Sequence, residues 1–114
     1  MKNLLALSEA VSGEPESLLT MDRVDGNKAY VKAAWPKGVQ GGARTLLKKA
    51  TASDTLAGFV RGWIHQHGQR PDGFVQIYCA AQPGPDKPFG PFLKVMSLQF
   101  SQGREVAPYD TFDL

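Results

Sequence analysis

Residues 43–51 read ARTLLKKAT, and the fold of this chain depends on the conformation that they adopt. Leucine and lysine are good helix formers, so intrinsic propensity favours a helix. The flanking residues favour a strand, because Gly41-Gly42 is typical of the end of a hairpin and Ser53 is a better start for the next helix. We predict a strand at residues 43–51. A helix there would instead give an α+β domain with two helices.

A helix is predicted to follow this stretch, with Ser53 or Asp54 as its N-cap and Gly68 just past its end. Gly58 and Gly62 lie one turn apart and are expected to let another backbone approach closely. Each lowers helix stability by about 1 kcal/mol relative to alanine, so tertiary packing must hold the helix. Apolar side chains recur at the spacing of a buried face, namely Leu56, Phe59, Val60, Trp63, Ile64 and His67.

Four more strands are predicted from alternating apolar and polar residues and from the turns between them. Asp25-Gly26-Asn27 is typical of a hairpin turn, because glycine and asparagine tolerate positive φ. Proline and glycine predict loops at residues 36–42 and 83–91. The four strands are expected at Leu18–Val24, Ala29–Trp35, Phe74–Gln82 and Phe92–Ser101.

These elements predict a small β-rich α+β domain with five strands and one main helix between strands 3 and 4. That is the element order of an OB-fold barrel, so an OB-like barrel is the leading architecture. The length of 114 residues is enough for one core. Residues 1–16 are expected to be a lead-in or short helix, 17–103 the globular domain, and 104–114 an acidic, aromatic tail.

The charge of the chain is concentrated in its middle. Residues 28–70 hold eight basic residues and one acid, whereas residues 1–27 sum to −3 and residues 71–114 to −2. A basic body with an acidic tail indicates a surface for a polyanion and a separate contact segment, unless the surface is merely solvated. If strands 2 and 3 pair, five basic residues form one patch, namely Lys28, Lys32, Arg44, Lys48 and Lys49.

The compartment is expected to be the cytoplasm. Cys79 is the single cysteine and lies in an apolar run, which is typical of a buried residue in a reducing environment. The apolar run at residues 4–7 is too short for a signal-peptide core. No stretch approaches the roughly 20 apolar residues that a membrane span needs.

Basic and aromatic residues share faces of two predicted strands. Lys28, Tyr30 and Lys32 lie on one face of their strand, and Phe74 and Tyr78 lie on the non-core face of another. Exposed aromatic residues on strands suggest either a platform on which bases stack or a surface covered by the N-terminal segment or a dimer partner. The predicted binding site comprises Lys28, Tyr30, Lys32, Arg44, Lys48, Lys49, Phe74, Tyr78 and Lys87.

Motifs that carry catalysis or bind metals are not found in the sequence. His65 and His67 lie two apart on a predicted helix, so their side chains diverge and cannot chelate one ion together with Cys79. The loop at Gly38–Gly42 lacks the Gly-Lys-Ser/Thr of a phosphate-binding loop. No serine has the context of a nucleophile elbow. We predict no catalytic residue, no metal and no cofactor.

The passage from Leu56-Ala57-Gly58-Phe59-Val60 to Phe74-Val75-Gln76-Ile77-Tyr78 resembles the helix-to-strand passage of bacterial single-stranded-DNA-binding proteins. Those proteins also carry an acidic tail that ends in hydrophobic residues and recruits partner enzymes. Asp110-Thr111-Phe112-Asp113-Leu114 is similar in character. The resemblance implies an OB fold, binding of single-stranded DNA, and a protein contact through residues 110–114.

We therefore expect non-enzymatic binding of single-stranded nucleic acid, with lysines on phosphates and aromatic rings on bases. The alternative is a small interaction protein from a phage or other mobile element, an inhibitor or adaptor that binds a larger protein or nucleoprotein complex. A helix at residues 43–51 would argue against the barrel and would shift weight to this alternative. The sequence leaves open whether the protein forms a homo-oligomer.

Overall fold

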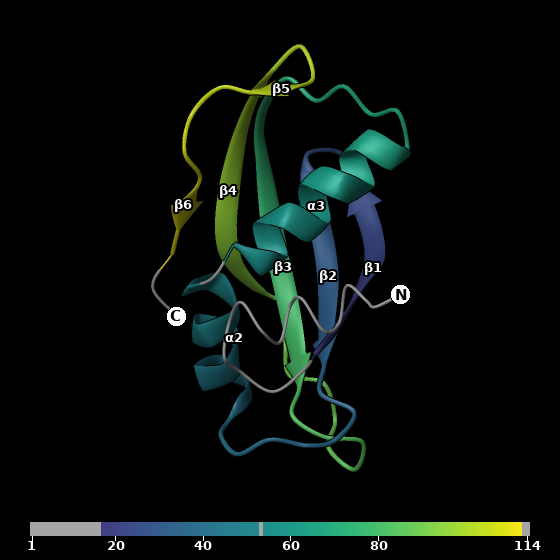
Figure 1. The fold of residues 1–114 in the computed structure, drawn as a ribbon, viewed down its shortest axis with the longest axis vertical. Coiled ribbons are helices and arrows are strands. Elements are labelled where there is room, and N and C mark those ends of the chain that lie inside the picture. The colour runs from purple at the N-terminus through teal and green to yellow at the C-terminus, as the bar shows by residue number, and fades with distance from the viewer. Residues whose placement is uncertain (1–16, 53, 113–114) are drawn as a thin grey trace.

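The computed structural model describes residues 17–52 and 54–112, which form a mixed β-sheet with two helices on one of its faces (Figure 1). The predicted lead-in at residues 1–16 and the candidate cap Ser53 lie outside the described residues. The small α+β class is confirmed. Neither described helix has the length and apolar content needed to cross a membrane.

The sheet is built from two hairpins that meet side by side. β1 pairs with β2 and β3 pairs with β4 in antiparallel fashion, whereas the central pair, β2 and β3, is parallel. The strand order is β1-β2-β3-β4-β5, and β6 also pairs with β4. All four predicted flanking strands are confirmed, as β1 (Leu18–Asp25), β2 (Lys28–Ala34), β3 (Gly73–Gln82) and β4 (Leu93–Ser101), and they are joined by the short β5 (Arg104–Glu105) and β6 (Asp110–Thr111).

The strand predicted at residues 43–51 is wrong, because α2 spans Ala43–Ala52. Leu46, Leu47 and Thr51 are buried on one side of this helix, and the Thr51 hydroxyl donates to the Leu47 carbonyl at 3.0 Å. The physical reason lies in the sheet. Parallel neighbours need a long crossover, usually helical, and residues 35–72 provide it between β2 and β3. The intrinsic helix propensity of residues 43–51 and the need for a helical crossover therefore favour the same conformation.

This correction changes the architecture. Both helices lie between the second and third strands, and not one helix between the third and fourth as predicted. Figure 1 shows α3 lying obliquely across a strongly twisted sheet, with α2 beside the end of β3. Two bulges, at Asp22 in β1 and opposite Ile77/Tyr78 in β4, add to that twist. The curled sheet is compatible with a barrel-like fold, but the OB-like barrel is not confirmed.

The main helix, predicted to start at Ser53 or Asp54, is confirmed as α3 (Thr55–Gln66). Gly68 adopts φ +63° just past its end, as a helix-terminating glycine does. Asp54 occupies the N-cap position, but its carboxylate accepts from Arg61 Nη1 at 3.1 Å and makes no capping hydrogen bond. The close approach expected at Gly58 and Gly62 is wrong, because a Cβ added at either would meet no atom within 4 Å.

The core lies between the helices and one face of the sheet. Alternate residues of β2 and β3 point into the core, as the alternation predicts. Leu47 of α2 and Val60 of α3 pack on it from the helical layer. The core residues of β2 and β3 are Ala29, Val31, Ala33, Val75, Ile77, Cys79 and Ala81, and β4 adds Val95, Met96, Leu98 and Phe100.

Residues 104–112 of the predicted tail run along β4. Thr111 is the register partner of Met96, and the Phe112 N–H donates to the Val95 carbonyl at 3.1 Å. Arg61 of α3 also bonds to this segment, through the Glu105 carboxylate. That hydrogen bond raises the pKa of Arg61. The segment therefore pairs with β4, at the edge of the sheet opposite β1.

We predict that Leu47→Ala lowers the free energy of unfolding by about 2–5 kcal/mol, because it empties a fully buried position under α2. Chemical denaturation monitored by circular dichroism measures the change. Lys48→Ala, on the exposed side of the same helix, is the matched control and should stay within about 0.5 kcal/mol. Equal small effects from both variants would show that α2 does not pack on the core.

Candidate functional site

The candidate site is the face of the sheet opposite the helices, which we call the open face. Because Ala29 and Val31 point into the core, the residues between and beside them on β2 point the other way. Phe74 and Tyr78 do the same on β3, and the Phe74 side chain is 48 % exposed. No helix in the described part of the chain covers this face.

A row of stacked side chains crosses three strands on the open face. The Arg23 guanidinium of β1 lies 3.8 Å from the centroid of the Tyr30 ring on β2. The Tyr30 ring stacks on Tyr78 of β3, with centroids 4.9 Å apart and planes 16° apart. Arg23, Tyr30 and Tyr78 are successive register partners, which brings their side chains together. We call these three residues the stacked row.

Residues that precede β4 support the row from the side. The Phe92 ring meets Tyr30 edge-on, with centroids 5.3 Å apart. The Lys32 ammonium lies 5.0 Å from the centroid of the Phe89 ring. Contacts of a cation or a ring edge with an aromatic ring are each worth about 0.5–1.5 kcal/mol, so the arrangement restrains these side chains.

Asp22 organises the cations of the open face. It occupies the bulge of β1, where it has no register partner. Its carboxylate accepts from Arg23 Nη1 at 2.9 Å and lies 3.6 Å from Lys32 Nζ. Lys28, opposite Asp25 in the register, adds a third cation. The face therefore carries two cations that Asp22 pairs, Arg23 and Lys32, and a third, Lys28, for which the register places a carboxylate on the neighbouring strand.

Two polar groups lie buried beside the stacked row without a hydrogen-bond partner. They are Gln76 Oε1 and Ser97 Oγ, and their residues are register partners on β3 and β4. An unsatisfied buried polar atom costs about 1–3 kcal/mol, and such atoms are rare in native proteins outside functional sites. If neither atom is hydrogen-bonded in solution, each lowers the stability of the sheet.

The structure brings together five of the nine predicted site residues. Lys28, Tyr30, Lys32, Phe74 and Tyr78 all lie on the open face. The proposed patch of paired basic strands does not form, because Arg44, Lys48 and Lys49 lie on α2, in the other layer. Lys87 lies in the loop between β3 and β4, where its N–H donates to the Gly84 carbonyl.

Sequence reasoning missed Arg23, Phe89 and Phe92. Arg23 lies within a predicted strand, but the bulge at Asp22 shifts it to the open face, and a bulge leaves no clear signal in one sequence. The two phenylalanines lie in or next to a loop rich in proline and glycine, where alternation cannot assign a face.

His67 and Cys79, which were considered above for catalysis and metal binding, each have a structural role. His67 stacks on Trp63 with centroids 4.0 Å apart. Cys79 is fully buried, and burial raises its pKa from 9.0 to about 12, so the thiolate that a nucleophile or metal ligand needs is even scarcer at pH 7 than for an exposed cysteine. Within residues 17–52 and 54–112, no three His, Cys, Asp or Glu side chains lie close enough to hold a metal ion.

Comparison of the chain with protein-family models, with curated proteins and with solved structures finds no match.

We predict that Cys79 makes stability fall at alkaline pH. The unfolded thiol ionises near its ordinary pKa of 9.0, whereas the folded thiol stays protonated to about pH 12. Between these values the unfolded state binds fewer protons, so unfolding becomes easier by about 1.4 kcal/mol per pH unit. Denaturation of wild type and Cys79→Ala across this range measures the difference. Parallel curves for the two proteins would contradict the burial of the thiol.

We predict that Ser97→Ala leaves stability unchanged or raises it by up to about 1 kcal/mol, because it removes a buried hydroxyl without a partner. Thr51→Val is the matched comparison. Its hydroxyl donates to the Leu47 and Lys48 carbonyls at 3.0 Å, so its removal should cost about 1 kcal/mol. Urea denaturation compares the two. A larger loss from Ser97→Ala would mean that its hydroxyl is bonded in solution.

Proposed function

We propose that this protein binds single-stranded nucleic acid on the open face of its sheet and catalyses no reaction. The stacked row carries the proposal. Bases stack on aromatic rings and on guanidinium groups regardless of sequence, with about 1–3 kcal/mol per base from an aromatic ring. A row of one arginine and two tyrosines on an open sheet face offers such a platform.

The exposed rings indicate where bases would stack. Tyr30 already has Arg23 on one side and Tyr78 on the other. Bases would therefore stack on Phe74, which is about half exposed, and on the outer side of Tyr78. These two residues are four positions apart on β3, or about 13 Å at the usual rise of a strand. That distance suits a short stretch of extended, unpaired nucleotides.

The cations around the row supply the electrostatic part of binding. Lys28 and Lys32 flank Tyr30 on β2, and Arg23 lies next to it on β1. Phosphate contacts release counterions, so binding through them weakens as salt increases. Because Asp22 holds Arg23 and Lys32 in place, the phosphates would meet cations that are already positioned.

A second candidate is the interaction protein, an inhibitor or adaptor that binds a protein or nucleoprotein complex. The helical conformation of residues 43–51 shifts weight toward it. The free edge of β1 also favours it, because β1 ends the strand order and has no partner on that side among the described strands. Leu18 and Val24 on this strand are 42 % and 43 % exposed. An extended segment of a partner could add a strand there. A partner that survives nuclease treatment and is lost in Leu18→Lys would favour this candidate.

We predict micromolar binding of labelled oligothymidine that weakens with salt, measured by fluorescence anisotropy at several salt concentrations. Tyr78→Ala should weaken binding at least about fivefold through lost stacking. Lys28→Gln should reduce the slope against salt by about 0.7, the value for one phosphate of a single strand.

Lys48→Gln is the matched control for this experiment, since it makes the same charge change on α2. It should leave the slope nearly unchanged. Equal losses from both lysine variants would place the binding elsewhere than the open face. No salt-sensitive binding at micromolar oligonucleotide would reject the proposal.

A further inference from the structure

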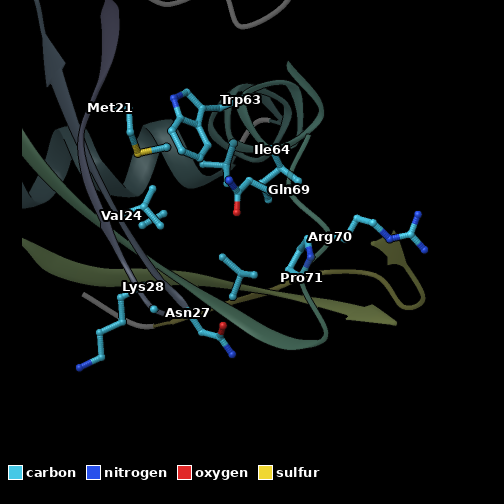
Figure 2. Close-up of a pocket in the computed structure, with 13 residues that line it drawn as sticks. Met21, Val24, Asn27, Lys28, Trp63, Ile64, Gln69, Arg70 and Pro71 are labelled. Carbon is cyan, nitrogen blue, oxygen red and sulfur yellow. The ribbon is translucent and has the colours of Figure 1, made fainter. Parts of the chain in front are cut away.

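A cleft of about 120 Å³ lies between α3 and the hairpin of β1 and β2, on the opposite face of the sheet from the stacked row (Figure 2). Met21 and Val24 of β1 form one wall, and Trp63 and Ile64 of α3 form the other. The binding proposed for the open face does not explain this cleft, which lies on the other side of the sheet.

The size and walls of the cleft suit one flat ring. An engineered apolar cavity of about 150 Å³ binds benzene, so a space of this order accepts a single aromatic ring and little more. The indole of Trp63 is half-buried and borders the space opposite Val24. The indole is restrained by stacking on the His67 ring, with ring centroids 4.0 Å apart. A planar ring that enters would lie between an indole and aliphatic side chains.

The cleft also contains one polar group, which distinguishes a heteroaromatic ring from a plain apolar one. Figure 2 shows the side-chain amide of Gln69 projecting into the space beneath Trp63. An amide presents a donor and an acceptor together, which is the pattern that pairs with the edge of a nucleobase. A phenyl or alkyl group would make no hydrogen bond to that amide.

Cations stand outside the cleft on two sides. Lys28 and Arg70 line it through their inner atoms, and Figure 2 shows their charged ends pointing away from the space in different directions. A ring in the cleft could therefore carry a phosphate outside it. Lys28 also belongs to the open face, so it connects the two surfaces.

We infer that this cleft binds the single-ring pyrimidine base of a nucleotide, whose phosphate remains outside, near Lys28 or Arg70. The inference rests on the proposed function for the source of the base, which would be a nucleotide of the bound strand that passes the turn between β1 and β2. Its test uses mononucleotides, so it does not depend on binding at the open face.

The probe is uridine 5′-monophosphate at millimolar concentration, whose base is a single ring, and binding is followed by the NMR signal of the Trp63 indole N–H, which Trp63→Phe assigns. Ribose 5-phosphate is the matched control, because it has the same phosphate and no base. The nucleotide should shift the Trp63 signal saturably, and the sugar phosphate should not. The signal of Trp35, which is buried in the core, should not move.

Three variants test the position of the site. Val24→Trp fills the cleft and should abolish the shift, whereas Val106→Trp, at an exposed position outside the cleft, should leave it unchanged. Gln69→Leu alters an exposed side chain and should weaken the binding of the nucleotide at least about fivefold.

The inference is overturned if the nucleotide causes no shift, if ribose 5-phosphate causes the same shift, or if the shift survives in Val24→Trp. A response to benzyl alcohol alone would also overturn it, and would assign the cleft to an apolar side chain of a protein partner. A nucleotide response in a protein that binds no oligothymidine would sustain this inference and reject the proposed function.

Discussion

The parallel pairing of β2 with β3 is the constraint on which the rest of the structure depends. Seven register pairs join these central strands, from Lys28 with Gln76 to Ala34 with Gln82. Because both strands run the same way, the chain must return from the end of β2 to the start of β3, and α2 and α3 form that return. The two helices then cover one face of the sheet and supply Leu47, Leu56 and Val60 to the core.

The same pairing determines what the other face can present. Tyr30 and Tyr78 are register partners across the parallel pair, so their rings stack on the open face. The antiparallel hairpin of β1 and β2 adds Arg23 to the row, and the bulge at Asp22 holds that arginine in place. One side of the sheet is thus committed to the core, while the other carries rings, cations and unsatisfied polar atoms. The proposed binding function rests on this division.

Sequence patterns predicted the parts of this structure that depend on local chemistry. Alternation placed Val31, Ile77 and Cys79 in the core, and therefore Tyr30 and Tyr78 on the opposite face. The patterns failed where the decision was not local. The segment at 43–51 has helical propensity, but the choice depended on whether β2 and β3 run parallel, and no residue within the segment encodes that. Arg23 was missed because its orientation follows from a bulge, and Phe92 because its neighbours form a loop.

The most direct test of the central claim is to map the backbone amides that oligothymidine shifts in the NMR spectrum of the whole chain. The account predicts that the largest shifts cluster on β1, β2 and β3 around Arg23, Tyr30 and Tyr78, and that the exposed side of α2 changes little. Shifts concentrated on α2 around Lys48, with the stacked row unchanged, would contradict it, and so would a spectrum that the oligonucleotide leaves unaltered.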